Sequence, residues 1–299
     1  MNESPVGAAP LPQNERRELL QRICALVAAG MASGGATIAG CGGGSSSGGV
    51  AFVASSGGPV PSPAPSPPSS GSPPPPPPPT SPGLAAPALG AHGLGFNRLN
   101  TSAAALSVSG LATGASGSSL LVCIGRGNQA AAATPTDNAG NVFVQLDSTH
   151  TYTLYPSSGT ALFACEKARG LASHTVAAAK PDPLDEVTLT VVEVTGGGRV
   201  RDLKWREVLS GQPLTSASVT TTGAALLVAW WWGDAGVDGD KTALPDSGFT
   251  VIDSVLAAGA LVQCAVAVKQ VAAAGTYNLT WTSTPQQGAQ LWLAAVQAG

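Results

Sequence analysis

The chain has 299 residues, of which only 10% are charged, and its formal net charge is −3. Nucleic-acid-binding proteins need a basic surface against the phosphates, so this charge balance argues against nucleic acid as a partner. The 38 Gly and 25 Pro, with most of the Pro in one block, indicate that about a third of the chain builds no hydrophobic core.

The first segment, residues 1–40, predicts an export signal. Arg16, Arg17 and Arg22 precede an uncharged and moderately apolar run, Ile23–Ala39. A charged start, an apolar middle and a small-residue exit are typical of a cleavable signal. The glycines within the run make it a poor permanent membrane span. Arg16-Arg17 fits either an ordinary positive start or a twin-arginine signal, and both interpretations stay open.

The segment ends on Ile38-Ala39-Gly40-Cys41. This tetrapeptide, directly after an apolar run, resembles the lipobox of bacterial lipoproteins. The resemblance implies that Cys41 is acylated and becomes the mature N-terminus, and that Gly42 permits delivery to the outer membrane. We therefore expect an exported protein that is lipid-anchored to the bacterial envelope, at the outer membrane or the cell surface.

Residues 41–91 predict a disordered stalk. A Gly/Ser tract, Gly42–Gly49, leads into Pro61–Pro68 and then into seven consecutive prolines, Pro73–Pro79. Gly/Ser tracts form flexible coil, and polyproline forms a semi-rigid left-handed helix. At roughly 3.1 Å per residue, the stalk reaches on the order of 150 Å.

The remaining residues, 92–299, predict an all-β domain. Short strand-like runs recur with Gly, Pro, Asp and Asn between them, and Asp202–Leu209 is the best candidate for a short helix. This pattern predicts an antiparallel β-sandwich, either Ig-like or a jelly roll. The expected strands are Ser119–Ile124, Asn141–Leu146, Tyr152–Tyr155, Ala161–Cys165, Val187–Val194, Ala224–Trp232, Phe249–Val255, Ala260–Val268, Tyr277–Thr282 and Gln290–Val296.

An internal duplication is predicted over about 118–195 and 224–297. Ordered matches recur at a spacing of about 100 residues, which is the size of one β-sandwich unit. They pair Leu120 with Leu226, Phe143 with Phe249, Cys165 with Cys264 and Leu189 with Leu291. One pseudo-symmetric sandwich and two tandem units both fit this pattern.

The domain resembles the Ig-like or jelly-roll modules of secreted bacterial surface proteins. The resemblance rests on the turn Asp137–Phe143, which precedes a strand, and on the apolar strands Leu162–Glu166 and Val191–Glu193. It implies a fold and a location, and it transfers no catalytic residue.

Three cysteines fall inside apolar strands: Cys123, Cys165 and Cys264. They fit either small core side chains or one disulfide plus a free thiol, which an oxidising compartment permits.

No catalytic motif stands out. Asp147 and His150 fit a polar strand end, because neighbours on a strand point to opposite faces. Carboxylates for glycosidase chemistry are available, although nothing in the sequence makes two of them converge. They are Glu166, Glu186, Glu193 and Glu207.

The candidate binding site is Trp231 with the acidic loop that follows it, which contains Asp234, Asp238 and Asp240. Trp230 and Trp232 share the face of Leu226 and Val228, so Trp231 points the other way and is expected to be exposed as a stacking platform. The alternative is that a second layer buries all three indoles. The three aspartates are a weak calcium candidate without EF-hand spacing, and no other cofactor is indicated.

These features predict a surface-anchored, non-catalytic binding or adhesion module whose partners are the membrane, through the lipid, and a surface glycan or protein. Two alternatives remain: a secreted polysaccharide-acting hydrolase or lyase, and a structural envelope lipoprotein. Two carboxylates converging beside Trp or Tyr in a groove would favour the enzyme.

Replacing Cys41 by Ser should abolish lipidation, because only the cysteine thiol accepts the diacylglycerol that supplies membrane affinity. Labelling cells with radioactive palmitate should mark the wild-type chain and leave Cys41→Ser unmarked. Equal labelling of both chains would contradict the lipobox assignment.

Overall fold

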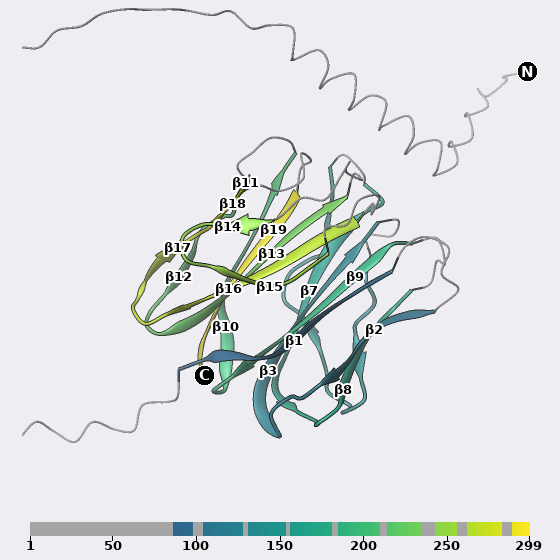
Figure 1. Cartoon of the computed structure of the whole chain (residues 1–299), viewed down its shortest axis with the longest axis horizontal. Coiled ribbons are helices and arrows are strands. Elements are labelled where there is room, and N and C mark those ends of the chain that lie inside the picture. Colours follow the sequence, from purple (N-terminus) through teal and green to yellow (C-terminus); the bar gives the residue numbers. More distant parts are fainter. Residues whose placement is uncertain are drawn as a thin grey trace, which may run out of the picture. The chain divides into compact units, whose positions relative to one another are not determined.

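The computed structural model describes residues 86–97, 104–127, 131–153, 156–180, 185–209, 214–234, 243–255, 262–282 and 289–299. The expected signal, Cys41 and almost all of the expected stalk lie outside these residues. The regular structure of the described part is antiparallel β-strand, labelled β1–β19 in chain order (Figure 1). This part of the chain contains no helix that could cross a membrane.

The first half of the domain, which we call repeat one, is built on one main sheet with the strand order β1-β9-β3-β7-β5. Its strands are β1 (Ala88–Asn97), β9 (Val187–Thr195), β3 (Ser116–Arg126), β7 (Gly159–Arg169) and β5 (Val144–Gln145), and β6 (His150–Thr151) also pairs with β7. A small sheet, β2-β8-β4, accompanies it and consists of β2 (Ala105–Leu111), β8 (His174–Ala179) and β4 (Thr136–Asp137).

The second half, repeat two, has a main sheet with the order β10-β19-β13-β16-β15. Its strands are β10 (Gly198–Val208), β19 (Ala289–Ala298), β13 (Ala225–Asp234), β16 (Val262–Val271) and β15 (Thr250–Val255). Two small sheets, β11-β18-β14 and β12-β17, consist of β11 (Leu214–Thr215), β18 (Thr280–Thr282), β14 (Leu244–Pro245), β12 (Val219–Thr221) and β17 (Gly275–Tyr277).

The two repeats share one topology. In repeat one, β1 pairs with β9, β9 with β3, β3 with β7, and β2 with β8. In repeat two, β10 pairs with β19, β19 with β13, β13 with β16, and β12 with β17. This is the strand order of a jelly roll, one of the two sandwiches that the sequence left open. The first strand of each repeat also carries a register shift at the corresponding place, between Leu89 and His92 and between Val200 and Asp202. The duplication is therefore present in the backbone.

Two of the four sequence matches join equivalent positions. Phe143 and Phe249 are both buried immediately before β5 and β15, the corresponding edge strands. Leu189 and Leu291 lie on β9 and β19, each on the face of its main sheet turned away from the other repeat.

The other two matches are wrong. Leu120 belongs to the outer core of repeat one, whereas Leu226 lies in the core between the two main sheets. Cys165 and Cys264 are on opposite faces in the same way. Successive side chains of a strand point to opposite faces, so an alignment that is wrong by one residue, or by any odd number of residues, places each side chain on the wrong face. The identities at these two pairs arise from such a shifted alignment.

The strand pairing supplies the correct alignment. Leu121 lies between Val192 and Ala164 on its neighbouring strands. Val228 lies in the same way between Ala294 and Val268. All six residues belong to the core between the sheets, so Leu121 corresponds to Val228.

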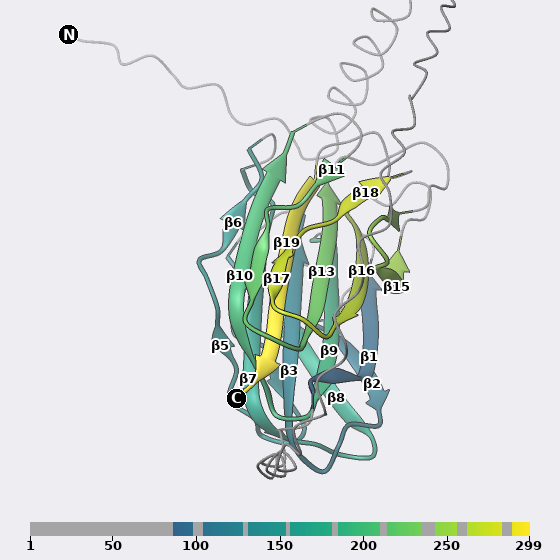
Figure 2. The ribbon, with the colours of Figure 1, turned by 90° about the vertical axis from the view of Figure 1, so that its left-hand side faces the viewer.

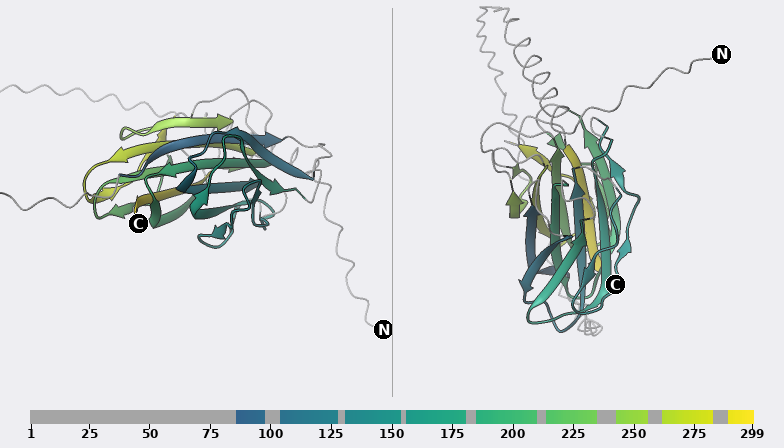
Figure 3. Two further views of the ribbon diagram at one scale, coloured as in Figure 1. Left: turned by 90° about the horizontal axis from the view of Figure 1, so that it is seen from below. Right: turned by 90° about the vertical axis from the view of Figure 1, so that its right-hand side faces the viewer.

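The main sheets pack face to face, and each also has a covered outer face. Figure 2 shows β10, β19 and β13 lying across β3 and β9 of repeat one. Leu121, Leu162 and Val192 of repeat one share one buried cluster with Val228 and Val266 of repeat two. Two further clusters fill the space between each main sheet and its small sheets. The described strands therefore form stacked layers, seen from two more directions in Figure 3.

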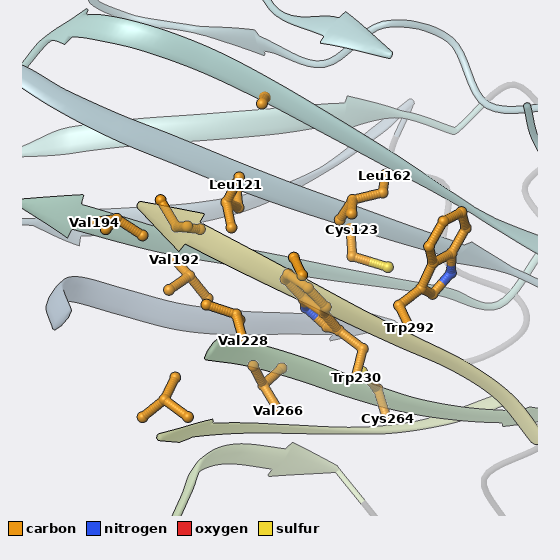
Figure 4. Packing of buried hydrophobic residues seen from close by; sticks show 14 of the residues in the cluster. Leu121, Cys123, Leu162, Val192, Val194, Val228, Trp230, Cys264, Val266 and Trp292 are labelled. Atoms are coloured by element: carbon orange, nitrogen blue, oxygen red, sulfur yellow. The ribbon is translucent and has the colours of Figure 1, made fainter. Parts of the chain in front are cut away.

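The inner core joins large side chains of repeat two to small ones of repeat one. Trp230 and Trp292 form a cross-strand pair on β13 and β19, and the corresponding pair on β3 and β9 is Cys123 with Thr190. Figure 4 shows both indoles between the sheets, opposite Leu121 and Cys123. Trp230 donates a hydrogen bond to Thr190 Oγ1 at 2.9 Å, and Trp292 donates one to Thr160 Oγ1 at 2.8 Å.

The three body cysteines are free and buried. Cys165 lies on the opposite face of its sheet from Cys123, and Cys264 belongs to the same inter-sheet core as Cys123. Burial raises the pKa of the Cys123 and Cys264 thiols, so these thiols stay protonated and pack as small hydrophobic groups.

Two local expectations are wrong. The helix expected over Asp202–Leu209 is part of strand β10. This is an edge strand whose inward side chains, Val200, Leu203 and Trp205, pack on the core after a register shift that disturbs strict alternation. The domain also begins earlier than residue 92, because β1 starts at Ala88.

The chain enters the domain at the end where it also terminates. Pro87 O accepts a hydrogen bond from Gln270 Nε2 at 2.7 Å, and Gly299 N donates one to Gly197 O at 3.2 Å. In Figure 1 the start of β1 lies near the C-terminus. We call this end the stalk end, and we call the other, where β1, β3 and β13 finish, the distal end.

The inner core predicts that Gly125→Ala destabilises the protein. A Cβ at residue 125 would lie 2.0 Å from Trp232 Nε1 and 2.6 Å from Thr188 Oγ1. Overpacking of this kind costs roughly 1–3 kcal/mol of unfolding free energy. Gly223→Ala is the matched control, because its Cβ would meet nothing within 4 Å. Urea denaturation should separate the two variants, and equal stability would contradict the close inter-sheet contact.

Candidate functional site

Trp231 is not on the surface. Its relative exposure is 0%, and it packs in the outer core of repeat two with Leu214, Phe249 and Trp281. The predicted direction of its side chain, opposite to Trp230 and Trp232, is confirmed. The predicted exposure is wrong, because the small sheet that carries Leu214 and Trp281 covers the outer face of the main sheet. Trp231 therefore offers no stacking platform.

The acidic part of the expected site is largely outside the described residues. Asp234 ends strand β13, and Asp238 and Asp240 fall in the segment 235–242, outside the described part. Within the residues that are described, no group of three or more His, Cys, Asp or Glu side chains could hold a metal ion. With Trp231 buried, the candidate site of Trp231 and the acidic loop is not assembled as expected.

A buried charged cluster lies at the distal end. Arg126, which ends β3 and is 1% exposed, forms an ion pair through Nε with Asp185 Oδ2. Asn97 Nδ2 donates to Asp185 O at 3.0 Å. Glu186 Oε2 accepts a hydrogen bond from Val262 N of repeat two at 3.1 Å. The cluster ties the two repeats together where their main strands end. Its members are far apart in the sequence. The one signal of the cluster in the sequence is that Arg126, Asp185 and Glu186 directly flank apolar strands.

A hydroxyl, an imidazole and a carboxylate are aligned beneath the small sheet of repeat one. Thr113 Oγ1 lies 3.0 Å from His174 Nδ1, and His174 Nε2 donates to Asp137 Oδ2 at 2.9 Å. The order of groups is that of a nucleophile relay. However, Thr113 is only 9% exposed, and its hydroxyl oxygen accepts a hydrogen bond from Leu171 N at 2.9 Å. The network holds the chain in place and does not present a nucleophile.

Asp137 also fixes the turn that follows it. Its Oδ1 accepts hydrogen bonds from Ala139 N and Asn141 N, and its Oδ2 accepts one from Asn141 Nδ2. Burial alone would raise the pKa of Asp137, but the hydrogen bonds from Asn141 and His174 lower it below its ordinary value. Within the turn Asp137–Phe143, Asp137 and Asn141 therefore serve to fix the backbone.

The four glutamates considered for glycosidase chemistry are engaged separately. Glu193 accepts hydrogen bonds from Ala91 N and Gly114 N, and Glu186 accepts the one from Val262 N. Glu207 accepts hydrogen bonds from Thr153 N and Oγ1. Glu166 forms an exposed ion pair with Arg199 at 3.2 Å. Each carboxylate serves a different element, so these four do not form the paired acid and base of a glycosidase.

His150 joins the two repeats by stacking. Its ring lies 4.0 Å from that of Trp205 with an interplanar angle of 7°, and its Nε2 lies 3.0 Å from Asp147 Oδ2. One face of Trp205 is therefore already occupied by His150. The expected polar strand end at 147–150 is an inter-repeat contact.

Exposed cations gather instead on one edge strand. Three of them lie on β10: Arg201, Lys204 and Arg206. Beside Arg201 the surface is hollowed over a volume of about 530 Å³, with Thr220, Thr222 and Gln297 among the lining residues. Ligand pockets in proteins typically measure roughly 300–1,000 Å³. The composition gave no sign of this surface, because the whole chain is slightly acidic.

The chain matches no family model, no curated protein and no solved structure.

Asp137→Asn should cost more stability than Asp147→Asn, although each removes a carboxylate paired with a histidine. The Asp137–His174 side chains are 0% exposed, whereas those of Asp147 and His150 are 47% and 20% exposed. Breaking the buried hydrogen bonds costs about 1–3 kcal/mol, and an exposed ion pair contributes about 0–1 kcal/mol.

The same pair of variants predicts a pH effect. The pKa of Asp137 is lower in the folded protein than its ordinary value of 3.8. The ionised carboxylate therefore stabilises the fold at pH values above 3.8, and this stabilisation is lost as the pH falls through the pKa of the folded state. Thermal unfolding of Asp137→Asn should therefore depend less on pH below about 4 than that of the wild type. Equal midpoints and slopes for both variants would contradict the structural role of Asp137.

Proposed function

We propose that this protein is a surface-anchored, non-catalytic binding or adhesion module. The observation that carries the proposal is the exposed row of cations on β10 beside the hollow at Arg201. Among the described residues, Arg201 Nη2 has one contact, 3.5 Å to Ala298 O, at the edge of hydrogen-bonding range. An arginine side chain has five N–H donors, so most of its binding capacity is free.

The position of this surface suits a protein held on a stalk. The chain enters the domain at Pro87, at the stalk end, and β10 runs from Gly198 at that end toward the distal end. A long connector that attaches at one end leaves the side of the domain accessible. Lipid attachment at Cys41 and export remain part of the proposal and rest on the sequence alone.

The polysaccharide-acting enzyme has weaker support. The groups with catalytic chemistry are used inside the fold: Thr113 and His174 hold the turn of repeat one, and Glu186 and Glu193 accept backbone N–H groups. The exposed groups on β10 are cations, which bind anions, and no described carboxylate pair stands beside them to serve as the acid and base of a glycosidase. A structural envelope lipoprotein would need no such surface.

Three outcomes separate the binding module from its rivals. The purified, unlipidated Cys41→Ser chain should bind saturably to a glycan array or to isolated bacterial envelopes, and should release no new reducing ends or unsaturated sugars from them. Product release would favour the enzyme. Absence of saturable binding to both materials would contradict the proposed function and favour a structural role.

A further inference from the structure

The cations of β10 share one side of the strand. Lys204 and Arg206 pair with Leu293 and Leu291 of β19, whose side chains lie in the outer core of repeat two. Paired residues on antiparallel strands point to the same face, so Lys204 and Arg206 also point outward. Arg201 stands at the register shift and lines the outer hollow. Arg199, farther toward the stalk end, is held by its ion pair with Glu166 and is not part of this row. At about 3.4 Å per residue, the row from Arg201 to Arg206 extends over roughly 17 Å.

The acidic residue within this row is already neutralised. Asp202 Oδ2 accepts hydrogen bonds from Thr220 N at 2.8 Å and from Thr220 Oγ1 at 3.0 Å, and its Oδ1 pairs with Lys204 at 2.8 Å. The same ion pair offsets the charge of Lys204, so Arg201 and Arg206 are the cations of the row that no described carboxylate pairs. Among the described residues, Arg206 makes one contact, from Nη1 to Thr215 O at 3.3 Å, which leaves most of its donors free of them.

The hollow extends this row at the stalk end. Arg201 forms part of its wall, and Thr220, Thr222 and Gln297 add hydroxyl and amide groups. Thr220 Oγ1 donates to Asp202 and Gln297 Nε2 donates to Thr222 Oγ1, so the oxygen atoms of the two hydroxyls and the remaining amide hydrogen are what these groups offer a sugar. Hydroxyl and amide side chains bind sugar hydroxyls, and arginine binds carboxylates through two parallel hydrogen bonds. One surface thus combines sugar-binding groups in a hollow with carboxylate-binding groups in a line.

We propose that this surface binds an extended acidic polysaccharide of the polyuronate class, with one sugar in the hollow and its carboxylate on Arg201. The following uronates lie along β10 against Lys204 and Arg206. A polyuronate carries one carboxylate per sugar. Duplex DNA carries a charge about every 1.7 Å, far denser than the widely spaced cations of this strand. This inference rests on the proposed function and names its ligand class.

The test uses the unlipidated Cys41→Ser chain with polygalacturonate as the probe and dextran as the neutral polymer. Lys204→Gln/Arg206→Gln removes two charges from the row. The control, Lys167→Gln/Lys269→Gln, removes one charge from β7 and one from β16. It therefore has the same net charge as Lys204→Gln/Arg206→Gln. Thermal unfolding establishes that both double variants are folded. Biolayer interferometry then gives the dissociation constants at low and physiological salt.

The wild type should bind polygalacturonate more weakly at higher salt and should not bind dextran. Lys204→Gln/Arg206→Gln should raise the dissociation constant about fivefold or more, while the control double variant stays within about twofold. Arg201→Gln should weaken binding in the same direction.

Three results would overturn the inference: equal weakening by both double variants, tighter binding to duplex DNA than to polygalacturonate, or unchanged binding by Lys204→Gln/Arg206→Gln.

If Lys204→Gln/Arg206→Gln binds polygalacturonate as the wild type does and also self-associates in sedimentation, the cations serve to keep the edge strand from pairing with other chains. Binding of a different glycan through Arg201 and Lys204 would overturn the ligand class and leave the proposed function standing. Saturable binding to no glycan and to no envelope material would count against both.

Discussion

Each main sheet has two apolar faces, and the whole arrangement depends on covering both. The inner faces cover each other, and the small sheets cover the outer ones. The inner contact is asymmetric: Trp230, Trp232 and Trp292 of repeat two stand where repeat one has Cys123, Gly125 and Thr190. A fully buried Trp removes roughly 150–250 Å² from water, which stabilises the fold by about 4–6 kcal/mol as an upper estimate.

This asymmetry pairs the two repeats with each other and disfavours two copies of either one. Two faces like that of repeat two would bring indoles against indoles, and two faces like that of repeat one would leave cavities, which are costly in a close-packed core. The hydrogen bonds from Trp230 to Thr190 and from Trp292 to Thr160 fix the relative position of the sheets. A core built in this way consumes the aromatic side chains: five of the six tryptophans are fully buried, and the sixth, Trp205, is stacked under His150. No described indole is therefore free on the surface, and the exposed cations Arg201, Lys204 and Arg206 lie outside this core on the edge strand β10.

Much of this fold could be predicted from residue patterns, because strands with turn residues between them carry a local signal. The jelly-roll duplication was visible in Phe143 and Phe249 and in Leu189 and Leu291, which occupy equivalent places. The first strand of each repeat was missed for physical reasons: β1 contains Gly90, Gly93 and Gly95, which weaken strand propensity, and β10 contains a bulge. Those glycines are required by close packing, since a Cβ at Gly93 would lie 2.8 Å from Val108.

The candidate site could not be predicted in the same way. The alternation of side chains correctly gave the direction of Trp231, but exposure depends on whether another layer covers that face, and layers are set by tertiary contacts. The cation row was hidden for a related reason. Its residues span Arg201 to Arg206 and overlap the short helix expected over Asp202–Leu209. The hollow beside them is lined by residues of β12 and β19, which are distant in sequence.

The central claim is that neither repeat is stable without the other's inner face, and coincident unfolding tests it directly. All six tryptophans lie in repeat two, so their fluorescence reports on that repeat. Alkylation of Cys165, quantified on its peptide, reports on repeat one, because Cys165 is buried in the outer core of that repeat. Both probes should give the same midpoint and the same slope across a urea titration, as expected for one cooperative unit. Two separated midpoints would show that the repeats unfold independently, and would contradict an account in which their face-to-face packing holds the domain together.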